Sequence, residues 1–102
     1  MPNWIRVGSA SEVPDGGCRL FEVGGHAIAV FRAEGGMHAI DNTCLHRGGP
    51  LNEGSIQGTI VTCPWHFWTY DVTTGKSTMA GEVAVRKYPL EVRGEDLFVD
   101  VG

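Results

Sequence analysis

Two short segments of the chain each carry one cysteine and one histidine. They are Cys44-Leu45-His46 and Cys63-Pro64-Trp65-His66, separated by 16 residues. Thiolate and imidazole are the side chains with which proteins hold iron–sulfur clusters and zinc. A [2Fe–2S] cluster with two cysteine and two histidine ligands fits this pattern if each segment gives one ligand to each iron. The spacing therefore predicts a metal centre held between two loops.

Zinc is the alternative reading of the same four residues. Two cysteines and two histidines also suit a tetrahedral structural zinc ion, which would make the chain a zinc-stabilised interaction module. Structural zinc sites more often pair like ligands, as Cys-x-x-Cys with a His pair. The mixed halves in this chain favour the cluster over zinc.

The residues around the four ligands extend the pattern. The run from Cys44 through Gly54, the Pro64 after the second cysteine, and the continuation Tyr70 to Lys76 resemble the two-loop motif of Rieske proteins. The resemblance covers nearly the whole chain and is closest to the soluble Rieske-type ferredoxins of bacterial oxygenase systems. The small subunit of assimilatory nitrite reductase is also similar.

The resemblance implies one [2Fe–2S] cluster per chain, with the ligands divided into two pairs. Cys44 and Cys63 would bind a buried iron, and His46 and His66 would bind the iron that faces a redox partner. Replacing two thiolates by neutral imidazoles makes reduction easier, so the expected potentials are about −150 to +300 mV.

The neighbours of the ligands place the expected potential at the low end of that range. By the resemblance, Gly49 and Trp65 stand where respiratory Rieske proteins carry two disulfide-bonded cysteines, and Trp68 stands where they carry a serine that donates to the cluster. Tyr70, by contrast, matches a tyrosine that donates to a ligand sulfur, which would raise the potential modestly. Gly48 and Gly49 are expected to let backbone N–H groups approach the cluster sulfides or to permit a positive φ. We expect a potential below about 0 mV.

Outside these loops the sequence reads as β-structure. Glycine accounts for 15 of 102 residues, which favours an all-β domain with many tight turns. Gly24-Gly25 predicts a hairpin turn, and Ser9 to Val13 predicts a single helical turn. The expected strands are Trp4–Val7, Arg19–Val23, His26–Arg32, Met37–Ile40, Thr59–Thr62, Phe67–Val72, Val83–Val92 and Leu97–Val101.

The expected fold is all-β: a Rieske-like antiparallel β-sandwich forming a single domain over residues 1–102. A small cluster-binding lobe, about residues 41–70, is inserted into it. Cys18, His26 and His38 lie in predicted strands and are expected to be structural. Gly54 is expected either to let backbone N–H groups approach the cluster sulfides or to permit a positive φ.

Composition limits the partners. The net charge is −4 and the pI is about 5.4, so a basic face for nucleic acid is not expected. The longest apolar stretch, about Ala27 to Phe31, is too short to span a membrane. Two of the three cysteines lie in the motif, which indicates a reducing, cytoplasmic compartment rather than a disulfide framework.

The predicted function is that of a one-electron carrier. It would pass electrons from a flavin-dependent reductase to a terminal oxygenase, and it is expected to be a monomer when free. The chain itself is not expected to be an enzyme, because its length is used up by the cluster domain. The alternative is the small Rieske subunit of an NAD(P)H-dependent nitrite reductase, which would share every ligand.

Overall fold

The computed structural model describes residues 3–33, 36–43, 50–65, 67–78 and 84–102. Its strands form three antiparallel sheets with the orders β1-β10-β9, β2-β3-β4-β8 and β5-β6-β7. The strands are β1 (Trp4–Ser9), β2 (Cys18–Val23), β3 (His26–Ala33), β4 (Gly36–Asp41), β5 (Ser55–Gln57), β6 (Ile60–Thr62), β7 (Thr69–Asp71), β8 (Lys87–Tyr88), β9 (Leu90–Arg93) and β10 (Asp96–Asp100). The expected all-β fold of antiparallel sheets is confirmed.

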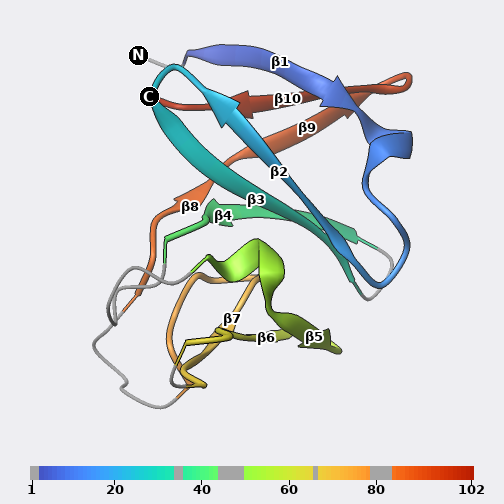
Figure 1. The fold of residues 1–102 in the computed structure, drawn as a ribbon. Helices are drawn as coiled ribbons and strands as arrows, with labels where there is room; N and C mark the ends of the chain where they lie inside the picture. Colours follow the sequence, from blue (N-terminus) through green and yellow to red (C-terminus); the bar gives the residue numbers. More distant parts are fainter. Residues whose placement is uncertain (1–2, 34–35, 44–49, 66, 79–83) are drawn as a thin grey trace.

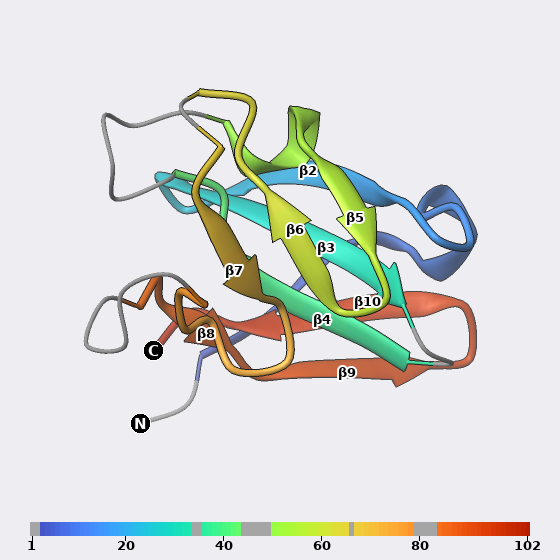
Figure 2. The ribbon, with the colours of Figure 1, turned by 90° about the horizontal axis from the view of Figure 1, so that it is seen from below.

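The three sheets are stacked as layers. Figure 1 shows the sheet of β2, β3, β4 and β8 between the sheet of β1, β10 and β9 on one side and the smaller β5–β7 sheet on the other. Figure 2, seen from below, shows β5, β6 and β7 lying across β3 and β4. We refer to the β5–β7 sheet and the 3₁₀ turn Leu51–Glu53 as the lobe; it overlaps with the cluster-binding lobe expected at about 41–70, which stays a prediction.

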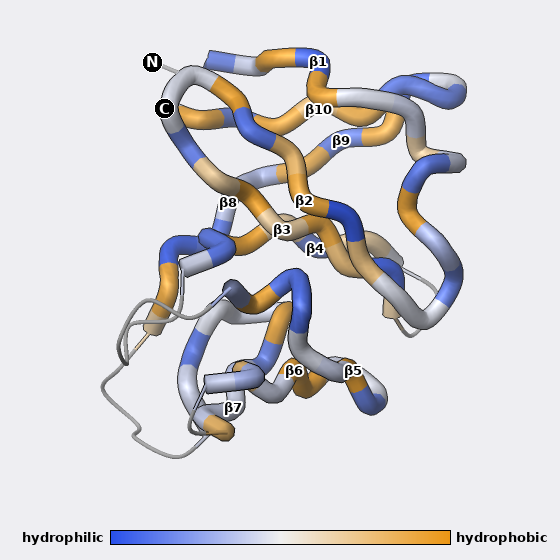
Figure 3. Tube along the Cα trace, in the orientation of Figure 1, coloured by the Kyte–Doolittle hydropathy of each residue, from blue (hydrophilic) through white to orange (hydrophobic). Residues whose placement is uncertain are grey.

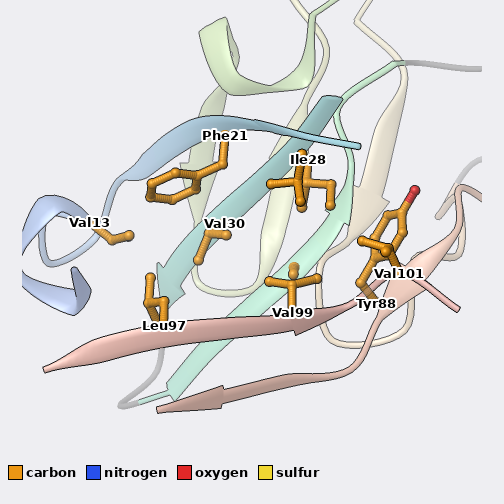
Figure 4. Packing of buried hydrophobic residues seen from close by; sticks show 10 residues of the cluster. Val13, Phe21, Ile28, Val30, Tyr88, Leu97, Val99 and Val101 are labelled. Carbon is orange, nitrogen blue, oxygen red and sulfur yellow. The ribbon is translucent and has the colours of Figure 1, made fainter. Parts of the chain in front are cut away.

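The first core lies between the two larger sheets. Figure 4 shows Ile28 and Val30 of β3 pointing toward Leu97 and Val99 of β10, with Phe21 beside them. The buried members of this core are Val13, Phe21, Val23, Ile28, Val30, Ala39, Tyr88, Leu97, Val99 and Val101. In a strand, successive side chains point to opposite faces. Ile28 and Val30 therefore share one face of β3, and Leu97 and Val99 share one face of β10.

The second core lies between the middle sheet and the lobe. The other face of β3 contributes Ala29 and Phe31, and β4 contributes Ile40. The buried members are Ala29, Phe31, Ile40, Leu51, Val61, Cys63, Tyr70, Val72 and Val85. The run from Ile28 to Phe31 is therefore buried on both faces, which explains its continuous apolar sequence. Figure 3 shows the most hydrophobic stretches on interior strands such as β3 and β10.

Two short turns of 3₁₀ helix accompany the strands. The first, Ala10–Glu12, follows Ser9, whose backbone N–H donates to the Glu12 carboxylate at 2.7 Å. It occupies the place where the sequence predicts a helical turn. The second, Leu51–Glu53, lies at the lobe, and its Leu51 side chain is buried in the second core. No helix in the described part of the chain is long and apolar enough to cross a membrane.

The C-terminal strands differ from the prediction of one strand from Val83 to Val92. Lys87–Tyr88 pairs with β4 in the middle sheet, whereas Leu90–Arg93 pairs with β10 in the outer sheet. Pro89 lies between them and has no N–H to donate, so the ladder is interrupted there and the chain changes sheets. A turn precedes β10, because Arg93 pairs with Asp96 and Gly94 has φ 64°.

Candidate metal centre

The structure describes part of the predicted site. Cys63, Trp65, Trp68 and Tyr70 belong to the described residues. The other predicted site residues lie outside them and their roles stay predictions: Cys44, His46, Gly48, Gly49 and His66.

Cys63 follows β6 directly and its side chain is fully buried in the second core. Its backbone N–H donates to the Trp68 carbonyl oxygen at 2.7 Å. This hydrogen bond closes the β6–β7 loop, residues 63–68, at its base. A buried cysteine with a fixed backbone at the base of a short loop is what a deep thiolate ligand of a cluster requires.

The first predicted loop starts and ends at paired positions. Thr43 and Pro50 form an antiparallel bridge, and Leu51 donates its N–H to the Asn42 carbonyl oxygen at 2.7 Å. Leu51 is fully buried in the same core as Cys63. Both halves of the ligand motif are thus connected to one packed core, which fits a group bound between two loops.

A third segment begins and ends on the same core. Asp71 accepts hydrogen bonds from the Thr73 backbone N–H and hydroxyl at 2.9 and 2.7 Å, which stabilises the turn after β7. These bonds hold the pKa of Asp71 below its usual range. Lys76 then forms a bridge with Ala84. Residues 79–83 lie outside the described residues.

Trp68 and Tyr70 have different surroundings although only one residue separates them. Tyr70 pairs with Val61 in the lobe sheet and is fully buried in the second core. Trp68 is partly buried and packs against the same core. The expected donation from Tyr70 to a ligand sulfur stays a prediction, because the expected ligands at the other loop lie outside the described residues.

Trp65 and Phe67 are exposed, at 49% and 71%. Phe67 has φ 61°, the left-handed region, which costs a non-glycine residue about 1–2 kcal/mol. The expected strand Phe67–Val72 begins later than predicted, because β7 starts at Thr69. The short distance between β6 and β7 in the sequence, which forces the chain to reverse direction within a few residues, could have placed Phe67 in the loop.

Gly54 lies directly after the second 3₁₀ turn, and the expected approach of backbone N–H groups to the cluster sulfides there stays a prediction. Its φ is −80°, so a positive φ is not the reason for glycine. A Cβ at this position would lie 2.0 Å from the Thr62 carbonyl oxygen. Close approach of the β6 backbone therefore requires glycine there, and it brings the second 3₁₀ turn against the strand that ends at Thr62, next to Cys63.

The predicted structural residues lie in strands as expected. Cys18 in β2 is partly buried, and its thiol donates to the Asn52 carbonyl oxygen at 3.1 Å, linking the middle sheet to the lobe. Burial raises the pKa of the Cys18 thiol, which keeps it in the donating form. His26 in β3 contacts Tyr88, with 3.4 Å between Nδ1 and the hydroxyl. Burial and the nearby Lys87 lower the pKa of His38 in β4, while Asp71 opposes the shift.

The donor set and the described geometry fit an iron–sulfur cluster. Within the described ranges, no three His, Cys, Asp or Glu side chains come together as a metal site, so no second centre is found there. The candidate ligands are two cysteines and two histidines in two segments whose described ends pack on one core, and the one described candidate, Cys63, is buried at a loop base.

Comparisons with known proteins agree with this chemistry. A family model described as Rieske [2Fe-2S] domain matches residues 3–89. The ferredoxin component of the p-cumate 2,3-dioxygenase system of Pseudomonas putida is 41% identical over 80 residues, which are 76% of this chain and 68% of that protein.

Solved structures are similar along the chain. The ferredoxin of carbazole 1,9a-dioxygenase from Nocardioides aromaticivorans IC177 has a TM-score of 0.86 at 29% identity, covering 97% of this chain and 96% of that one. A chain in the complex of reduced oxygenase and oxidized ferredoxin in carbazole 1,9a-dioxygenase has a TM-score of 0.84 at 29% identity. That match covers 95% of this chain and 92% of the other.

Proposed function

This chain belongs to the Rieske [2Fe–2S] domain family, and on that premise we propose that it is the ferredoxin component of an oxygenase system. It carries one electron at a time on one [2Fe–2S] cluster held by Cys44, His46, Cys63 and His66. The electron comes from a flavin-dependent reductase and passes to a terminal oxygenase. The chain transfers the electron and does not itself act on the oxygenase substrate.

One observation carries the proposal. The similarity to a solved ferredoxin spans 97% of this chain and 96% of the other, so the likeness concerns the electron carrier as a whole. The relatives reported above are ferredoxin components of oxygenase systems, which supports this assignment over the nitrite reductase subunit. The family match also replaces the zinc alternative, because a Rieske domain implies a [2Fe–2S] cluster.

Some residues of the chain bind the cluster, and others pack around it and keep its surroundings fixed. The bound cluster supplies a centre that takes up and releases a single electron without large rearrangement. Cys63 is held at the base of the β6–β7 loop by its hydrogen bond to Trp68. Tyr70 and Leu51 fill the core beneath the loops and exclude water from that side. The rigid bases keep the ligand geometry similar in both redox states.

The remaining features of the proposal follow from the sequence. We propose a single cluster domain over residues 1–102, with a lobe at about 41–70, that works in the cytoplasm as a monomer. Redox proteins are its partners, and nucleic acid and membrane are not. Net charge −4 supports the absence of a nucleic-acid partner.

The test has two parts. The purified protein should be coloured and contain iron and acid-labile sulfide in equal amounts, two of each per chain. Reduced by a flavin-dependent ferredoxin reductase, it should then reduce terminal oxygenases of the p-cumate or carbazole type in a stopped-flow experiment. Each chain releases one electron to the oxygenase and returns to the oxidised state. A colourless protein that retains zinc would overturn the cluster, and a coloured protein that reduces only a nitrite reductase would overturn the partner.

A further inference from the structure

Asn42 is a buried polar residue at the point where the chain leaves β4. Only 6% of it is exposed, and Asn42 and Ser77 are the buried polar residues in the described part of the chain. β4 ends one residue earlier, at Asp41, and the first predicted ligand, Cys44, lies two residues further along the chain. Burial of a polar group costs free energy unless the group is hydrogen-bonded, so each donor and acceptor of Asn42 requires a partner.

Both backbone groups of Asn42 and its side-chain oxygen have partners. The backbone N–H donates to the Ala27 carbonyl oxygen at 2.9 Å, and the backbone carbonyl oxygen accepts from the Leu51 N–H at 2.7 Å. The side-chain oxygen, Oδ1, accepts from the Asn52 backbone N–H at 2.7 Å. These bonds connect the residue after β4 to β3 and to the second 3₁₀ turn, so Asn42 is held in place from both sides.

The bond from Asn52 also fixes the direction of the Asn42 amide. A backbone N–H donates only to the oxygen of a side-chain amide, so the nitrogen, Nδ2, must point the other way. Within the described ranges, no residue accepts a hydrogen bond from Nδ2, although the side chain is buried. An amide donor buried without an acceptor is costly, so its acceptor is expected beyond the described residues.

The first ligand segment offers the acceptor that fits best. Cys44, the thiolate ligand proposed there, lies two residues after Asn42. Asparagine side chains commonly form hydrogen bonds with groups two residues further along the chain. A thiolate sulfur carries negative charge, and a hydrogen bond to a charged acceptor is roughly twice as strong as one to a neutral carbonyl oxygen. The sulfur of Cys44 is therefore favoured over a backbone carbonyl of the same segment.

We propose that Asn42 donates a hydrogen bond from Nδ2 to Sγ of Cys44 and thereby raises the reduction potential of the cluster. This inference rests on the proposed function, because it requires Cys44 to be a cluster ligand. An added electron makes the sulfur ligands more negative, so an N–H donor stabilises the reduced state more than the oxidised state. Asn42 binds no iron, and its proton stays on the amide nitrogen in both states.

Two substitutions of Asn42 remove the donor in different ways. Asn42→Asp keeps the shape and the oxygen that accepts from Asn52, but it replaces the NH₂ group and adds a charge. Asn42→Leu adds no charge and removes both the donor and the acceptor. Asn52→Asp is the matched control, because it makes the same chemical change next to Asn42 and retains the backbone N–H that donates to Oδ1.

Each holo-protein is produced with asparagine labelled by ¹⁵N in the side-chain amide and is examined by pulsed EPR in the reduced state and by protein-film voltammetry. The wild type should show hyperfine coupling to ¹⁵N, which Asn52→Asp keeps and both Asn42 variants lose. Asn42→Leu should lower the equilibrium constant for reduction about tenfold, which is about 59 mV for a one-electron couple. Asn42→Asp should lower it further, because its charge acts in the same direction. Asn52→Asp should change it less than about threefold, since Asn52 is partly exposed and its charge is screened.

The labelled wild type tests the hydrogen bond without any substitution. An intact reduced cluster without ¹⁵N coupling would overturn the inference, and so would a wild-type potential in Asn42→Leu. A potential lowered by Asn42→Asp alone, or equally by Asn52→Asp, would assign the effect to charge. Coupling that disappears in Asn52→Asp would identify Asn52 as the donor. A wild type that binds no cluster refutes the proposed function itself, which is a different result from an intact cluster without coupling.

Discussion

Val85 donates its backbone N–H to the carbonyl oxygen of Gly75 at 2.8 Å, and this contact leaves no room for a side chain on Gly75. A Cβ there would lie 2.4 Å from the Val85 carbonyl oxygen, and Gly75 has φ 82°. The turn that follows β7 is thus pressed against the segment that leads into β8. Both belong to the second core through Val72 and Val85.

We predict that Gly75→Ala destabilises the protein more than Gly94→Ala does. Both glycines have positive φ, but nothing lies within 4 Å of a Cβ at Gly94. Gly94→Ala should therefore cost about 1–2 kcal/mol for the backbone alone, and Gly75→Ala about 1–3 kcal/mol more for the clash. Chemical unfolding of the two variants measures the difference. Equal free energies of unfolding would contradict the close contact.

Cys63 and Cys18 should respond differently to replacement by serine. Cys63→Ser removes a predicted cluster ligand, so iron content and visible absorption should be lost. Cys18→Ser keeps a group that can donate to the Asn52 carbonyl oxygen, so the spectrum should stay as in the wild type. Iron analysis and absorption spectra of both variants check this. A cluster retained by Cys63→Ser, or lost by Cys18→Ser, would refute the assignment of the thiols.

The midpoint potential should lie below about 0 mV. Trp65 stands where respiratory Rieske proteins are expected to carry a disulfide cysteine, and it is half exposed in a turn. Trp68 replaces the expected serine donor and packs against the second core instead. Protein-film voltammetry on the holo-protein gives the value. A reading above about +150 mV would show that other donors compensate.

Acid should destabilise the protein in part through His38. Burial and Lys87 lower the pKa of His38, so the folded state binds this proton less readily than the unfolded chain does. The stability is therefore complete above the ordinary histidine pKa of about 6.5 and falls as the pH drops below it. Replacement of His38 by glutamine should flatten the dependence of the thermal midpoint on pH between 7.5 and 5. An identical slope in wild type and variant would exclude His38 as a source.

The sequence predicts elements whose cause is local. Gly24-Gly25 forms the turn between β2 and β3 because both residues take positive φ, 55° and 83°, which the dipeptide favours by itself. The type of metal site was predictable for a similar reason, since Cys44, His46, Cys63 and His66 lie in two short segments of fixed spacing.

The missed features depend on neighbours that are distant in the sequence. β5, Ser55–Gln57, has only one apolar residue and becomes a strand because β6 pairs with it. The change of sheet at Pro89 follows from two different partners, β4 before it and β10 after it. The left-handed Phe67 depends on how the β6–β7 loop closes, which spacing alone does not reveal.

β3 contributes side chains to both cores, so unfolding of either core disturbs the packing of this strand. Ala29 faces the lobe and Val30 faces the outer sheet, and both side chains are completely buried. Any loosening of the lobe side of this strand would therefore spread to the strands of the outer sheet. The protein should therefore exchange its β3 amide hydrogens only by global opening, at one rate for both faces, and lose its metal and its fold in a single cooperative step.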